Sequence, residues 1–220
     1  MLRSLRSLEQ YAVAATDGDI GRVVDFLLDT EHWALRSLVV ETGDGRRVLV
    51  APGAVRTIDG SASRFTTVLT LSQVKSSPTI DPAPAKGAAG PPGRLRGAFE
   101  LRGYHVHGSD KDIGHVEDLL VDEESWVVPY LVVDTSNWWF AKKVLVAPHW
   151  ATRISWEEHM VFLNMTREAL KGSPEWIPTV PVNREYEGRL YAYYGRPAYW
   201  ASNAGPRGAK PDSALTAPDR

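Results

Sequence analysis

Two aspartate-rich motifs in this sequence have the residue types and spacing of a metal-binding loop. The pattern Asp-x-Asp-x-Gly occurs at 17–21 and again at 110–114, where alternating carboxylates could converge on calcium. A calcium loop of this kind needs a bidentate glutamate at its twelfth position, but that position holds Leu28 in one motif and Val121 in the other. The glycine also comes one position too early. We therefore interpret both motifs as tight turns and caps, which aspartate and glycine favour.

A second matched pair of carboxylates, Asp25 and Asp118, falls in the middle of two apolar, β-branched segments. Such groups could act as a general acid and base, but no partnering base accompanies them in both places. Aspartate is unfavourable inside a strand, so we expect each carboxylate to make a hydrogen bond or salt bridge within the fold. Asp29 and Asp122, at the strand ends, receive the same interpretation. The sequence thus predicts no catalytic residue and no enzyme activity.

Three histidines, His105, His107 and His115, could lie on one strand face, which is how many zinc or copper sites begin. The sequence offers no fourth ligand, so an exposed strand face is the favoured interpretation, and we predict no metal and no cofactor. Metal binding by these histidines stays an open alternative. The sequence contains no cysteine, which excludes disulfides, thiolate catalysis and cysteine metal ligands.

The spacing of these motifs reflects an internal repeat. About half of the residues from 11 to 42 recur without a gap at 104–135, an offset of 93. After a three-residue insertion the match resumes at an offset of 96, with Val-Leu-Val-Ala-Pro at both 48–52 and 144–148. Each copy runs for about 70 residues, which is the size of a small domain.

Within each copy, short β-branched segments bounded by turn residues predict strands. They are Arg22–Leu28, Leu35–Glu41, Arg47–Ala51 and Arg64–Leu71 in the first copy, and His115–Val121, Tyr130–Thr135, Lys143–Ala147 and Met160–Asn164 in the second. Connections this short exclude parallel crossovers, so we expect antiparallel sheets that close into barrels and leave no exposed edge. The predicted fold class is mainly β: two tandem small antiparallel β-barrels with short capping helices, packed about a pseudo-twofold axis.

Composition divides the chain into five parts. The two barrels occupy 1–78 and 94–176, and the segment 79–93 is a linker because it is rich in proline, alanine and glycine. Residues 177–200 carry a helix with an apolar stripe of tyrosines and leucine, followed by an aromatic tail. Residues 201–220 are small, polar and proline-containing, and we expect them to be disordered.

Composition also bounds the location and the class of partner. No run of 18 apolar residues could span a bilayer, and the first six residues lack the apolar core of a secretory signal. We therefore expect a cytoplasmic protein with no transmembrane segment. The net charge of −2 gives no overall attraction to nucleic acid, so a nucleic-acid partner is not predicted.

Three motifs occur together in both copies, within residues 11–78 and 104–176: the turn Asp-x-Asp-Ile-Gly leading into Val-x-Asp-x-Leu-x-Asp, the strand Trp-x-x-x-x-Leu-Val-Val and the strand Val-Leu-Val-Ala-Pro. In combination they resemble the PRC-barrel family, in the form of a tandem two-barrel bacterial protein. The same fold is found in the cytoplasmic domain of the photosynthetic reaction centre H subunit and in the C-terminal domain of the ribosome maturation factor RimM. The resemblance implies a barrel that docks onto protein partners, and it implies no reaction.

Ten residues are predicted to contact a partner: Arg46, Arg47, Trp138, Trp139, Phe140, Lys142, Lys143, Tyr193, Tyr194 and Trp200. The aromatic residues at 138–140 lie in the insertion that the first copy lacks, where they either fold back onto the protein or its dimer, or are exposed for a partner. The two basic pairs precede matching strands and either meet phosphates or remain solvated.

The predicted function is that of a non-enzymatic docking or adaptor module whose partner is unknown and which forms a homo-oligomer. One alternative is a photosynthesis-linked accessory protein, related to the reaction centre H subunit and peripheral to the membrane. A second alternative is a role in RNA or ribosome assembly similar to that of RimM. Both alternatives follow from the resemblance.

Overall fold

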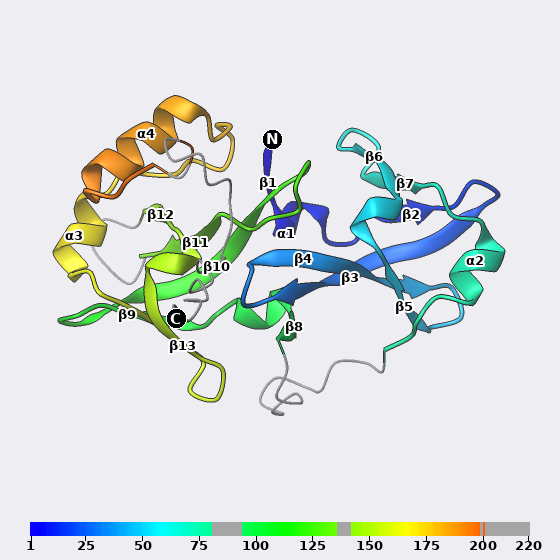
Figure 1. Ribbon diagram of the computed structural model, residues 1–220, viewed down its shortest axis with the longest axis horizontal. Helices are drawn as coiled ribbons and strands as arrows, with labels where there is room; N and C mark the ends of the chain where they lie inside the picture. The colour runs from blue at the N-terminus through cyan, green and yellow to red at the C-terminus, as the bar shows by residue number, and fades with distance from the viewer. Residues whose placement is uncertain (81–93, 136–141, 199, 201–220) are drawn as a thin grey trace, which may run out of the picture.

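The computed structural model describes residues 1–80, 94–135, 142–198 and 200. The protein is mainly β, as predicted, and consists of two halves side by side, each built on one seven-stranded sheet (Figure 1). The first half comprises the described residues up to 80, and the second half comprises those from 94 onward. Most of the predicted linker and all of the predicted disordered tail lie outside the described residues.

The elements of the two halves correspond one to one until the C-terminal helix. The first half contains β1 (Leu2–Ser4), α1 (Leu5–Leu8), β2 (Ala12–Ala14), β3 (Asp19–Asp29), β4 (Ala34–Thr42), β5 (Arg47–Val50), η1 (Pro52–Ala54), β6 (Val55–Asp59), β7 (Arg64–Thr67) and α2 (Leu71–Lys75). The second half contains β8 (Leu95–Gly97), η2 (Ala98–Leu101), β9 (His105–His107), β10 (Asp112–Asp122), β11 (Tyr130–Asp134), β12 (Lys143–Val146), η3 (Pro148–Trp150), β13 (Ala151–Ser155), β14 (Met160–Leu163), α3 (Arg167–Gly172) and α4 (Arg184–Tyr193).

Both sheets have the same strand order, β5-β4-β3-β2-β7-β6 in the first half and β12-β11-β10-β9-β14-β13 in the second. Most neighbouring strands are antiparallel, but β2 pairs with β7, and β9 with β14, in parallel. The expectation of wholly antiparallel sheets is therefore wrong at one pair of strands in each half. Several strands intervene between the two partners, and that connection is long enough to return the chain to the same end of the sheet.

The edge strands β5 and β12 are covered by the chain that leaves each sheet. Thr79 forms a bridge with Val48 of β5, and Glu175 forms the equivalent bridge with Val144 of β12. Among the described residues, the hydrogen-bonded strands of each half form an open sheet rather than the closed barrel that the sequence predicts. An edge covered in this way offers no free backbone for pairing with another chain.

Three of the helices begin after a residue whose side chain caps the first turn. Thr70 caps α2 through a capping box with Gln73, and Thr166 caps α3. Asn183 caps α4, whose side chains Leu190 and Tyr191 are buried. These caps satisfy backbone N–H groups that have no partner within the helix.

The two halves exchange their N-terminal segments (Figure 1). We call residues 1–8 (β1 and α1) the first arm and residues 95–101 (β8 and η2) the second arm. The first arm pairs its strand β1 with β10 of the second half, and the second arm pairs β8 with β3 of the first half. Each arm therefore extends the sheet of the half to which it does not belong in sequence.

The junction has a pseudo-twofold axis, as predicted. Leu35 N–H donates to the Trp126 carbonyl at 2.8 Å, and Val128 N–H donates to the Trp33 carbonyl at 2.7 Å. Positions 33 and 126, like 35 and 128, differ by 93, so the two bonds are equivalents of each other. Trp33 and Trp126 are half-buried with positive φ angles of 51° and 58°. They lie in the hairpin turns that meet at this junction.

The aromatic tail packs against the second half. Trp150 contacts Tyr191 and Tyr194, with ring centroids 5.2 and 5.0 Å apart respectively. Beneath α4, the buried Tyr130 hydroxyl donates to Glu187 at 2.9 Å. Position 37, the counterpart of Tyr130, is a serine, so the first half offers no such partner for a helix.

The exchange predicts that a truncation in the first arm destabilises the second half. Leu5 is fully buried on α1, which packs against β10. We expect Leu5→Ala to lower the free energy of unfolding by about 2–5 kcal/mol and to shift a single transition seen by both circular dichroism and tryptophan fluorescence.

The matched control is Leu95→Ala in the second arm, because Leu95 is 50% exposed and its truncation should cost less than about 0.5 kcal/mol. Two separate transitions, one of them unaffected by Leu5→Ala, would contradict the exchange of arms.

Candidate functional site

The matched carboxylates of the strands β3 and β10 bind the exchanged arms. Asp25 Oδ1 accepts the backbone N–H of Phe99 at 3.0 Å, and Asp118 Oδ1 accepts that of Arg6 at 3.1 Å. Positions 6 and 99 are equivalents under the offset of 93. Asp118 also accepts the hydroxyl of Ser4, whose counterpart in the second arm is Gly97. The prediction of a hydrogen bond for these two aspartates is confirmed, and the bonds join one half to the other.

Burial makes these carboxylates harder to ionise. It raises the pKa of Asp25 to about 6, while the N–H groups of Phe99 and Phe26 and the nearby Arg102 oppose the shift. Burial also raises the pKa of Asp118, against the opposing hydrogen bonds from Ser4, Leu119 and Arg6. Gly97 leaves no room for a side chain, because a Cβ there would lie 2.5 Å from Asp25 Oδ2.

The carboxylates at the strand ends hold charged groups. Asp29 accepts from Arg36 at 2.8 Å and lies 3.0 Å from the His32 ring nitrogen. Burial opposes its ionisation, but the hydrogen bonds from Arg36 and His32 outweigh burial and lower its pKa. Its counterpart Asp122 accepts from the N-terminal ammonium of Met1 at 3.0 Å. Both aspartates therefore act as structural anchors beside the arms.

The two Asp-x-Asp-x-Gly motifs are turns and caps, as the spacing predicts. Asp17 accepts the N–H of Leu71 at the start of α2, and Asp110 accepts that of Arg167 at the start of α3, at 2.7 and 2.8 Å. The glycines of the motifs are required because a Cβ at Gly21 would lie 1.9 Å from a backbone oxygen. Each motif thus joins the first turn of a short helix, through a hydrogen bond, to the start of the long strand.

The three histidines share one region of the second sheet. His105 and His115 are direct neighbours across β9 and β10, and His107 lies 2.6 Å from Asp112. Within the described ranges, no group of three or more His, Asp or Glu side chains is arranged to hold a metal ion. The rings occupy the strand face that the sequence indicates.

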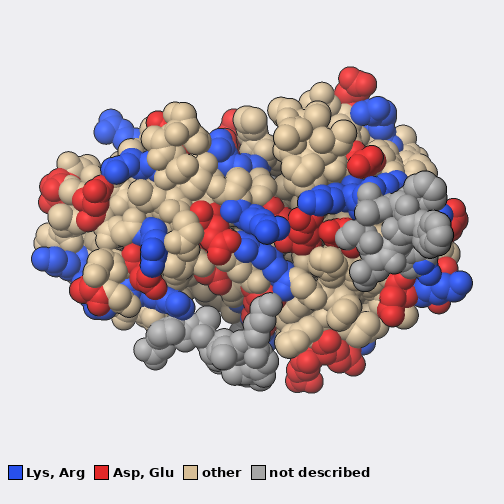
Figure 2. All heavy atoms as spheres, turned by 180° about the vertical axis from the view of Figure 1, so that it is seen from behind, with Lys and Arg blue, Asp and Glu red and all other residues tan. Residues whose placement is uncertain are grey.

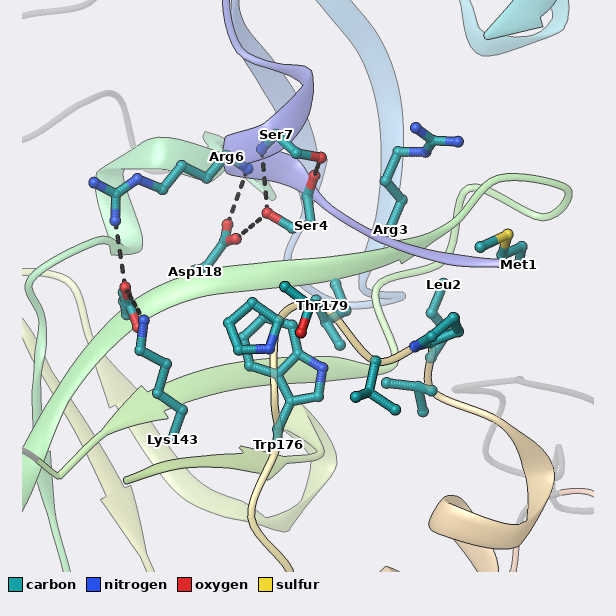
Figure 3. A pocket seen from close by; sticks show the side chains of 16 residues that line it. Met1, Leu2, Arg3, Ser4, Arg6, Ser7, Asp118, Lys143, Trp176 and Thr179 are labelled. Carbon is teal, nitrogen blue, oxygen red and sulfur yellow. Dashed lines mark hydrogen bonds and ion pairs between the residues drawn. The ribbon is translucent and has the colours of Figure 1, made fainter. Parts of the chain in front are cut away.

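A pocket of about 530 Å³ lies between the first arm and the segment 176–182, which follows the second sheet (Figure 3). One wall is polar and contains Ser4 and Asp118. The other is apolar and contains Trp176 and Val180, followed by Val182. The pocket exists because the first arm crosses to the second half, so it contains residues of both halves.

Charge in the pocket is unevenly paired. Arg6 Nη1 and Lys143 Nζ both bind the same oxygen of Glu117, at 3.3 and 2.7 Å (Figure 3). Two cations therefore share one carboxylate. The Arg6 side chain is 62% exposed, and at the rim Val180 is 53% exposed. An anion beside apolar groups matches this combination of exposed positive charge and exposed aliphatic surface.

The basic residues predicted to contact a partner occupy different environments. Lys143 lines the pocket, but Lys142 donates to the Ser173 carbonyl, and burial lowers its pKa. In the first half Arg46 pairs with Asp44 at 2.8 Å, and the Arg47 carbonyl accepts from the N–H of Ile80. The structure therefore does not bring the two basic pairs together.

The aromatic candidates within the described residues make contacts inside the second half. Tyr193 is partly exposed and donates from its hydroxyl to the Ala169 carbonyl at 2.8 Å. Tyr194 packs on Trp150, and Trp200 packs on Tyr191. The cluster 138–140 lies outside the described residues.

The pocket contains residues that the sequence analysis did not single out, namely Arg6, Trp176 and Val180. A signal was present, because 177–182 carries apolar residues between prolines directly after the second repeat. The sequence does not show that this segment lies close to the first arm, because that contact joins segments far apart in the chain.

A comparison with protein families supports the resemblance seen in the motifs. Residues 95–170 match the family model of the PRC-barrel domain, so the chain contains a domain of this family. The match covers β8 through most of α3. No curated protein matches the chain. In the parts of the chain that the structure describes, none of the helices has the length and hydrophobicity needed to cross a membrane.

The raised pKa of Asp25 predicts a dependence of stability on pH. In the unfolded chain this carboxyl titrates near its ordinary value of about 4. Because the folded pKa is higher, its contribution is fully present below about pH 4 and is lost as the pH rises through about 6. We expect the free energy of unfolding to fall by an amount on the order of 2 kcal/mol across this range.

Urea unfolding at a series of pH values measures this effect. Asp25→Asn keeps an acceptor for the N–H of Phe99 and should flatten most of the fall between about pH 4 and 6. Asp44→Asn is the control, because Asp44 is exposed and its pKa is lowered, so the fall should persist. An unchanged profile in Asp25→Asn would refute the assignment.

Proposed function

We propose that the protein is a non-enzymatic docking module and that the pocket between the first arm and residues 176–182 receives its partner. The observation that carries this proposal is the exposed aliphatic side chain of Val180 at the pocket rim, beside two cations that share one carboxylate. An apolar rim next to a charged wall is suited to a peptide segment that carries both kinds of side chain.

The partner chemistry follows from the two walls. Trp176 and the aliphatic rim accept an apolar side chain of the partner, and burial of that side chain provides most of the affinity. Arg6 and Lys143 bind a carboxylate of the partner and fix its orientation. The occupant is therefore an extended protein segment in which apolar and acidic residues are close together.

The proposal includes no catalysis because the carboxylates that match between the two copies have structural roles. Asp25 and Asp118 accept backbone N–H groups of the arms, and Asp17 and Asp110 accept those of helices. These carboxylates are committed to the fold, which leaves binding as the role of the exposed residues.

The proposal also covers the first half, the location of the protein and its oligomeric state. The first half is a second PRC-type unit, because its sheet repeats the strand order of the second. The protein is cytoplasmic and forms a homo-oligomer. The photosynthetic and ribosome-assembly alternatives rest on the family resemblance alone. No contact among the described residues supports either of them.

Synthetic peptides test the pocket. A fluorescein-labelled peptide of alternating leucine and aspartate should raise its anisotropy when titrated with the protein, and the same peptide with lysine in place of aspartate should bind at least about tenfold more weakly. The substitution Val180→Asp should weaken binding by about tenfold or more, because it removes the exposed aliphatic group of the rim and adds like charge.

Val68→Asp is the matched control, because Val68 is 56% exposed and belongs to the first half. It should leave binding unchanged. Equal binding by all variants, or no binding of the leucine–aspartate peptide up to about 1 mM, would refute the pocket as the docking site.

A further inference from the structure

The junction between the halves joins two similar surfaces, yet their side chains are complementary only when unlike halves meet. Glu9 and Arg102 occupy equivalent positions, since 9 and 102 differ by 93. Across the junction Arg102 Nη1 lies 2.7 Å from Glu9 Oε2. Pairing of two first halves would place Glu9 against Glu9, and pairing of two second halves would place Arg102 against Arg102. Like charges this close repel each other.

The surroundings of Arg102 strengthen this selection. Its side chain is only 22% exposed, and its guanidinium lies over the ring of Phe99 at 3.3 Å. Its Nε and Nη2 atoms are buried and have no hydrogen-bond partner among the described residues. Glu9 is therefore its bound counter-ion, and a half-buried guanidinium without one is costly.

Two further pairs of equivalent positions differ in the same complementary way. Position 6 is arginine in the first arm, and its counterpart Phe99 is apolar. Arg6 crosses to Glu117 of the second half, whereas Phe99 crosses to the first half and packs edge-on against Phe26 at 5.8 Å. The counterpart of Glu117 is Val24, which could not receive Arg6.

Figure 2 shows basic and acidic side chains alternating across the middle of the molecule, where the halves meet. Such interleaving is expected when charges are paired between the two sides of an interface. Pairing of two first halves would leave arginine facing valine, and pairing of two second halves would leave phenylalanine facing glutamate.

We propose that this junction is a heterotypic interface that selects the second half as the partner of the first, within one chain or between two copies of it. The three position pairs 9/102, 6/99 and 24/117 carry the selection. When two copies of the chain meet, the first half of one copy pairs with the second half of the other, and like halves do not pair.

A cut chain tests the selection. A protease site placed within 81–93 allows the folded, purified full-length protein to be cleaved into its two halves. After unfolding in urea and refolding, native mass spectrometry distinguishes unlike pairs from like pairs by mass. We expect the wild-type halves to return as unlike pairs only. A mixture containing like pairs at their statistical share would overturn the proposal.

The quadruple variant Arg6→Phe, Glu9→Gln, Arg102→Gln and Glu117→Val makes the three position pairs alike in both halves. After the same treatment, the ratio of unlike to like pairs should fall by about tenfold or more, because the charge complementarity is gone. A ratio equal to that of the wild type would overturn the proposal.

The uncut chain gives a second measurement that does not depend on refolding of the quadruple variant. Glu9→Arg alone should lower the midpoint of thermal unfolding, because it places two guanidinium groups together. The double variant Glu9→Arg and Arg102→Glu should recover most of that loss, because it restores opposite charges. A double variant no more stable than Glu9→Arg would show that the two positions are not coupled and would overturn the proposal.

Discussion

Asp25 and Asp118 each accept a backbone N–H from the arm of the opposite half, and the rest of the structure depends on these two hydrogen bonds. A buried carboxylate is stable only when its oxygens are bonded. Each aspartate lies in the strand that pairs with the exchanged arm. Its carboxylate therefore accepts this hydrogen bond only when the arm is in place. Leu5 and Leu8 of the first arm and Leu101 of the second are then buried in a core that is continuous between the halves.

The exchange also creates the surface that the chain offers to others. The first arm brings Arg6 to the second half, where it shares Glu117 with Lys143 beside Trp176. The corresponding place in the first half lacks these groups, since the counterparts of Glu117 and Trp176 are Val24 and Ile80. Duplication therefore supplied a scaffold, and divergence between the copies supplied both the pocket and the pairing of unlike halves.

Local features of the fold follow closely from the sequence. The long strands and the helix within 177–200 depend on neighbouring residues and form where the pattern indicates, except that the predicted strand Arg64–Leu71 ends at Thr67. The repeat also identified Asp25 and Asp118 as structural, because both copies keep them without a base.

The exchange of arms could not be predicted in this way. Both halves present similar apolar surfaces to the leucines of an arm, so the pattern does not say which half receives it. The parallel pairing of β2 with β7, and the position of Trp33 and Trp126 at the junction, depend on the same contacts between distant segments. The pocket was missed for this reason, because the first arm and the segment 176–182 are more than 100 residues apart in the chain.

Native-state hydrogen exchange of the amides of Arg6 and Phe99 tests most directly whether the arms join the halves into one cooperative unit. Both amides donate to buried carboxylates of the opposite half. If the arms open only when the whole molecule unfolds, their free energies of exchange will equal those of core amides such as Val40 and Val133 and will match the global free energy of unfolding. Exchange of both arm amides at a much lower free energy, with the core still protected, would contradict the account.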